Sequence, residues 1–160
     1  MLALGLATAV IVAILDQLSK MAVLAHFATQ AVDADRVTPF FNLVLTLNRG
    51  MSFGLFNRGP AAGGALNALL FSLAAVVIVA GLVYWLRRVA SPLLAVAIGL
   101  IVGGAIGNVA DRIRHGAVVD FLDFHIGYWH WPAFNLADSA ICLGVAMMLF
   151  DGLLLRREAH

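Results

Sequence analysis

The sequence predicts an all-α membrane protein with four transmembrane helices, because its composition is strongly apolar and its apolar residues gather in four long segments. Residues of the set AVILMFWYC make up 62% of the 160 residues, only 12% are charged, and the mean hydropathy is +0.97. An average soluble domain is about 25% charged, and a short soluble chain buries too little of its surface to hide so many apolar side chains. The composition therefore excludes a soluble globular domain, and it also excludes a disordered chain.

Four segments are apolar over enough residues to cross a bilayer, which takes about 20 residues. Arg87–Arg88 follow the second segment, Ser91–Pro92 precede the third, and Arg156–Arg157 follow the fourth. We expect one membrane-embedded domain over residues 1–160, with both termini on one side of the membrane. The expected spans are residues 2–24, 65–86, 93–110 and 135–155, and the expected loops on the other side are residues 28–64 and 112–134.

The first span is expected to be a retained helix and not a cleaved signal peptide. No Lys or Arg precedes its apolar run, and Asp16 and Lys20 occupy the region where a cleavage site would lie. Charge leaves the orientation open, because four arginines fall on the side of the termini and five on the other side. The net charge of +1 gives no indication of a nucleic-acid partner.

The two loops carry patterns of their own. Residues 41–47 would place four apolar side chains on one strand face and Asn42 and Thr46 on the other, which predicts a strand. Residues 48–50 form a turn signal. A second strand over residues 51–56 would complete a small hairpin or sheet on the membrane surface between the first two spans. The second loop carries three aromatic residues that suit the headgroup region, Tyr128, Trp129 and Trp131.

Ionisable groups at membrane depth are costly, so each needs a partner or a function. Asp16 and Lys20 are four residues apart and can form an ion pair on one helix face, with a structural role, or they can contact a substrate. Gly99, Gly103 and Gly107 recur every four residues, which favours close packing against another helix. Cys142 lies in an apolar run and is expected to be an inert buried thiol.

The strongest candidates for chemistry are two aspartates in apolar surroundings, Asp120 and Asp138. Asn135 is three residues before Asp138 and shares its helix face, whereas Asn108, Asp111 and Arg112 at the end of the third span can have a structural, capping role. Two neighbouring carboxyl groups can share one proton, so that one activates water and the other donates to a carbonyl oxygen. Spacing alone does not establish that these two aspartates meet.

Five motifs together resemble lipoprotein signal peptidase, also called signal peptidase II, an aspartic intramembrane peptidase family of bacteria. They occur in the family's order over nearly the whole chain, although the second motif usually reads closer to NTGAAFG. The motifs of this sequence are DQLSK at 16–20, NRGMSFG at 48–54, GGAIGNVADR at 103–112, VVDF at 118–121 and FNLADS at 134–139.

The resemblance implies removal of the signal peptide from diacylglyceryl-modified prolipoproteins, just before the lipidated cysteine, with Asp120 and Asp138 as the catalytic dyad. Asp120 is preferred to Asp123 because it matches the family position. The resemblance implies no metal or other cofactor, a monomer in the bacterial inner membrane, cytoplasmic termini, and an extracytoplasmic site with a β-cradle and a loop helix. It assigns site-shaping or substrate-binding roles to Asp16, Lys20, Asn48, Gly50, Asn108, Asp111, Arg112 and Asn135.

Two other functions remain as alternatives. A metal-dependent enzyme acting on lipid phosphates would hold Mg²⁺ with Asp111, Asp120 and Asp123, because clustered carboxylates bind hard cations. A small transporter or assembly subunit would use Asp16, Lys20 and Asp138 as a proton path.

Overall fold

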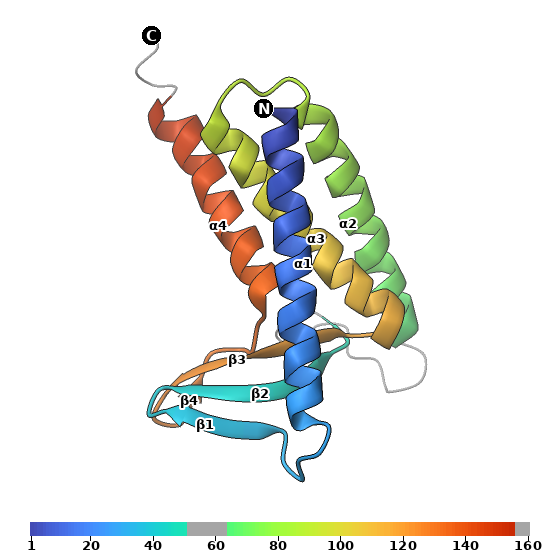
Figure 1. The fold of residues 1–160 in the computed structure, drawn as a ribbon, viewed down its shortest axis with the longest axis vertical. Helices are drawn as coiled ribbons and strands as arrows, with labels where there is room; N and C mark the ends of the chain where they lie inside the picture. Colours follow the sequence, from blue (N-terminus) through green and yellow to red (C-terminus); the bar gives the residue numbers. More distant parts are fainter. Residues whose placement is uncertain (51–63, 156–160) are drawn as a thin grey trace. The chain divides into compact units, whose positions relative to one another are not determined.

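The computed structural model describes residues 1–50 and 64–155, and the chain forms two compact units. The helical unit comprises Met1–Asp16, Leu73–Gly107 and the chain from Leu136 onward, and the sheet unit comprises Gln17–Ser72 and Asn108–Asn135. Within the described residues these units contain four α-helices and four strands (Figure 1). The helices are α1 (Leu2–Phe27), α2 (Gly64–Leu86), α3 (Pro92–His115) and α4 (Leu136–Phe150), and the strands are β1 (Ala34–Thr38), β2 (Phe41–Asn48), β3 (Val118–Ile126) and β4 (Trp129–His130).

The four predicted spans are confirmed as four helices that are long and apolar enough to cross a membrane. α4 continues as a π-helical turn over Asp151–Leu155. α1 continues to Phe27, three residues beyond its expected end. α3 extends beyond its expected end because the polar residues after Ala110 remain helical up to His115. α3 ends there because Gly116 has a φ of 66° and its N–H donates to the Arg112 carbonyl, a left-handed helix cap.

The helical unit packs around α3. In its most apolar window 67% of the residues of α3 are buried, against none in the window of α2. The buried core joins α1, α2 and α3 and consists of Ala9, Leu86, Leu94, Ala95, Ile98 and Val102. The outward residues are large and apolar, for example Val77 at 71% exposed. A soluble protein would bury such residues, so these faces are suited to lipid.

The predicted role of the glycines in helix packing is confirmed. A Cβ atom added to Gly103 would lie 2.5 Å from the Ala9 carbonyl oxygen, and one added to Gly104 would lie 2.5 Å from the Ala137 carbonyl oxygen. α3 therefore approaches α1 and α4 so closely that their backbones are in contact.

The expectation that Cys142 is a buried thiol is wrong, because its side chain is exposed. It lies two residues from the buried Ala140 and Gly144 and so faces away from the packed side of α4.

The sheet unit contains an antiparallel sheet in the order β1-β2-β3-β4 (Figure 1). The predicted strand at residues 41–47 is confirmed as β2, which pairs with β1 and β3. The small hairpin or sheet expected between the first two spans is part of a larger sheet, because β3 and β4 come from the second loop. The predicted return strand at 51–56 lies outside the described residues. In the described parts of the two loops there is no helix between Phe27 and Gly64 or between His115 and Leu136.

The end of α1 covers part of the sheet. Val23 and Phe27 of α1 pack with Phe121 of β3 in a buried cluster, to which Leu43, Leu45 and Leu122 add partly buried side chains. This cluster positions β3 beside the last turns of α1, so polar side chains of α1 can reach the beginning of β3.

Candidate active site

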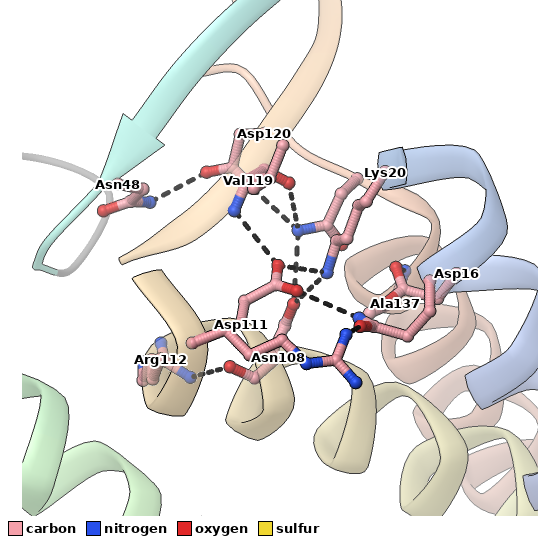
Figure 2. Close-up of polar contacts among 12 residues, drawn as sticks. Asp16, Lys20, Asn48, Asn108, Asp111, Arg112, Val119, Asp120 and Ala137 are labelled. Carbon is pink, nitrogen blue, oxygen red and sulfur yellow. Dashed lines mark hydrogen bonds and ion pairs between the residues drawn. The ribbon is translucent and has the colours of Figure 1, made fainter. Parts of the chain in front are cut away.

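Asp111 is the centre of a buried polar network in the sheet unit, and it lies near the end of α3. Its Oδ2 atom is 2.8 Å from Nζ of Lys20, and both side chains are almost fully buried. The same oxygen accepts a hydrogen bond of 3.1 Å from the Val119 backbone N–H (Figure 2). Asp111 thus ties the end of α3 to α1 and to the beginning of β3, whereas the helix cap itself is Gly116.

Two asparagines extend this network toward Asp120. Nζ of Lys20 donates to Oδ1 of Asn108 at 3.0 Å, and Nδ2 of Asn135 donates to the same oxygen at 3.2 Å. Nδ2 of Asn135 is also 2.7 Å from Oδ1 of Asp120 and 3.2 Å from the Val119 carbonyl oxygen. Asn135, which is fully buried, therefore connects the end of α3 to the carboxyl group of Asp120.

Both carboxyl oxygens of Asp120 have an amide donor. Oδ1 accepts from Asn135, and Oδ2 accepts from Nδ2 of Asn48 at 3.0 Å (Figure 2). Asn48 is itself oriented by its neighbour, because the Gly50 N–H donates to its Oδ1 at 3.1 Å. Asp120 is 2% exposed, so a buried carboxyl group is held in one orientation by side chains from two chain segments.

Asp123 has different partners from Asp120. The two residues are three apart on β3, so their side chains point to opposite faces of the strand. Asp123 accepts a hydrogen bond of 2.8 Å from Nδ2 of Asn42 and lies 2.8 Å from Nδ1 of His130. Burial alone raises the pKa of Asp123, but the hydrogen bonds from Asn42 and His130 outweigh it and hold that pKa below the usual value.

Asp138 and Asp16 belong to the helical unit. Asp138 is half-buried in the first turn of α4. The Ala137 N–H, one of the backbone donors that a helix start leaves without an intrahelical acceptor, donates to Oδ1 of Asp16 at 3.0 Å. A Cβ atom on Gly107 would collide with the Asp16 carboxyl group, so this glycine makes room for it. The ion pair between Asp16 and Lys20 stays a prediction.

Arg112 lies at the edge of the network. Its guanidinium donates to the Asn108 carbonyl oxygen at 3.5 Å and is 5.6 Å from the ring centre of Phe71. One contributor was missed by the sequence reasoning, namely Gln17, whose Nε2 donates to Oδ1 of Asp111 at 2.9 Å. Its position three residues before Lys20, on the same helix face, is the signal that was available.

The three aspartates of the magnesium alternative do not form a metal-binding group in the part of the chain that the structure describes. Within residues 1–50 and 64–155, no three side chains of His, Cys, Asp or Glu are arranged to hold a metal ion. Asp111 and Asp123, which that alternative required, are hydrogen-bonded to different partners.

Comparison with known proteins agrees with this architecture. Two solved structures of bacterial membrane enzymes superpose with TM-scores of 0.75 and 0.77, at 33% and 31% sequence identity. The first comparison covers 93% of this chain and 87% of the other, and the second covers 94% and 92%.

Sequence comparison is more specific. The chain is 48% identical to a lipoprotein signal peptidase of Paraburkholderia phymatum and 46% identical to one of Burkholderia mallei, in both cases over 95% of this chain and 89% of the relative. The family model described as signal peptidase (SPase) II matches residues 8–154. The chain is therefore a multi-pass membrane peptidase that belongs to the signal peptidase II family.

Proposed function

We propose that the chain is a lipoprotein signal peptidase of the bacterial inner membrane, an aspartic endopeptidase that cuts diacylglyceryl-modified prolipoproteins just before the lipidated cysteine. The observation that carries this proposal is the buried Asp120, with both of its oxygens held by amides, in a chain of the signal peptidase II family. The names of the relatives support the substrate class. Asp138, at the matching position of the FNLADS motif, is the proposed partner of Asp120 in one peptidase domain.

The proposed reaction is hydrolysis by two carboxyl groups that share one proton. The ionised group removes a proton from water as the water oxygen attacks the scissile carbonyl carbon, and the protonated group donates its proton to the carbonyl oxygen. When the intermediate collapses, the C–N bond breaks, the leaving nitrogen takes up a proton from one carboxyl group, and a hydroxyl of the intermediate gives its proton to the other carboxylate, which restores the dyad with one proton. The amide groups of Asn48 and Asn135 would hold Asp120 still during these transfers.

The remaining polar residues would position the dyad and the substrate. Lys20, Asn108 and Asp111 support Asp120 through Asn135 and the Val119 backbone. Asp16 would orient the first turn of α4, which carries Asp138, through its bond to the Ala137 N–H. Gly50 would fix Asn48, and Arg112 would contact the substrate beside the dyad.

Topology completes the proposal. Cytoplasmic termini would place the strands and the dyad at the outer leaflet, where water is available while the acyl chains of the substrate stay in lipid. The partners would be the prolipoprotein and membrane lipid, and the enzyme would act as a monomer without a cofactor.

The test is cleavage of a diacylglyceryl-modified prolipoprotein in membranes, followed as a gel shift. We expect Asp120→Asn and Asp138→Asn each to lower the rate by at least about 100-fold, the usual scale for a lost acid or base. Asp123→Asn is the matched control, because it changes a neighbouring aspartate on the opposite face of β3, and its rate should stay close to that of the wild type. EDTA should have no effect.

Two results would refute the proposal. If both dyad variants cleave while correctly inserted, the aspartic mechanism is wrong. If EDTA stops the wild-type enzyme, a metal-dependent reaction takes its place.

A further inference from the structure

Gln17 makes two contacts in the sheet unit that the proposed chemistry does not use. Its Nε2 atom donates to Oδ1 of Asp111 at 2.9 Å, and its Oε1 atom accepts a hydrogen bond from Nη1 of Arg114. Arg114 follows Asp111 by three residues on α3. The side-chain amide of Gln17 is therefore held between two residues of the same helix end.

The contact with Arg114 determines which way the amide points. A guanidinium only donates hydrogen bonds, so it requires the oxygen of Gln17 on its side. The nitrogen of the amide is then left facing Asp111. A single side chain of α1 is thus oriented as a hydrogen-bond donor to one defined carboxyl oxygen.

The other oxygen of Asp111 is the one that reaches β3. Oδ2 binds Lys20 at 2.8 Å and the Val119 N–H at 3.1 Å. Lys20 alone would hold the negative charge but would leave the carboxyl group able to rotate about its Cβ–Cγ bond. A donor on Oδ1 restricts this rotation and keeps Oδ2 directed at the Val119 N–H, one peptide unit before Asp120 (Figure 2).

We propose that Gln17 is a positioning residue for peptide cleavage, acting through Asp111 and the Val119 N–H to hold Asp120 in its reactive orientation. This inference rests on the proposed function, in which Asp120 is one half of the dyad. The effect of Gln17 is geometric: its hydrogen bond fixes the direction of the Asp111 carboxyl group. A small displacement of a reacting group is enough to slow catalysis.

The test uses the full-length enzyme in detergent with the lipidated precursor and the variant Gln17→Met, which keeps the length of the side chain and removes both hydrogen bonds. We expect kcat per folded enzyme to fall about tenfold, the effect of about 1.4 kcal/mol in the transition state, with KM unchanged. The matched control is Gln30→Met, because Gln30 also donates to an aspartate, Asp35 at 3.4 Å, in a part-buried contact of the sheet unit away from Asp111. It should leave kcat unchanged.

A second variant tests the order of the contacts. Arg114 is exposed, so Arg114→Met should fold, and it should lower kcat less than Gln17→Met because it only loosens the amide. If Arg114 acts through Gln17, the double variant has the kcat of Gln17→Met alone. Amide hydrogen exchange should become faster at residues 117–120 of Gln17→Met and stay unchanged at residues 34–38, which do not pair with β3.

The outcomes separate this inference from the proposed function. An inactive wild type would refute the function itself. A wild type that cleaves, with a Gln17→Met variant of equal kcat, would overturn only the role of Gln17. Equal losses in Gln17→Met and Gln30→Met, or independent effects of Gln17 and Arg114 that multiply, would show a general structural role instead.

Discussion

At the scale of single residues, the network depends on a buried cation and its partner. Lys20 and Asp111 are each about 2% exposed and lie 2.8 Å apart. Removing one member of such a pair costs about 3–5 kcal/mol, because the other charge stays buried. We expect Lys20→Met to lower the free energy of unfolding by about that amount, and the double variant Lys20→Met/Asp111→Asn to regain part of the loss. Thermal unfolding in detergent measures both.

The control for this pair is Arg88→Met. Arg88 is an exposed cation hydrogen-bonded to Tyr84, so its loss should change stability little. Two results would show that the buried pair does not stabilise the protein. Lys20→Met could lower the free energy of unfolding as little as Arg88→Met does, or the losses of Lys20→Met and Asp111→Asn could simply add in the double variant.

At the scale of the elements, helix packing depends on glycines at defined positions. A Cβ atom on Gly103 would lie 2.5 Å from a backbone oxygen and 2.8 Å from the Val12 side chain, and neither can move without shifting α1. We expect Gly103→Ala to destabilise the protein by about 1–3 kcal/mol, the cost of overpacking. Gly81→Ala in α2 is the matched control: nothing lies within 4 Å of its added Cβ, so the better helix propensity of alanine should keep or raise the melting temperature. Equal melting temperatures in the two variants would contradict this account.

The same elements show what a sequence can predict about the fold. Spans and glycine packing were predictable, because apolar length and a four-residue spacing are local signals. β2 was predictable from its alternation, whereas β3 was read as a loop because it begins as a buried run without alternation, and such a run is ambiguous. β1 and β4 are short and lack a pattern of their own, so only their pairing with β2 and β3 defines them.

At the scale of the whole molecule, the motifs contain the members of the buried polar network but carry no information on how these residues are connected. The contacts of Asp111 with Lys20 and Val119 join residues far apart in the chain, and periodicity carries no information on such contacts. The motif match preferred Asp120 to Asp123, and the opposite faces of the two side chains agree with different roles. The position of Gln17 on the helix face of Lys20 was a local signal, but its contact with Asp111 follows only from the fold.

The orientation of the molecule in the membrane can be tested, because consecutive loops between four spans lie on opposite sides. Arg88 lies between α2 and α3, and Tyr128 lies between α3 and α4, so one crossing separates them. With cytoplasmic termini, a membrane-impermeant thiol reagent applied to intact bacteria whose outer membrane is permeabilised should label Tyr128→Cys and not Arg88→Cys. Both variants need a Cys142→Ser background, because Cys142 is exposed. The opposite labelling pattern would reverse the orientation and place the dyad on the cytoplasmic side, where the proposed reaction on exported precursors has no substrate.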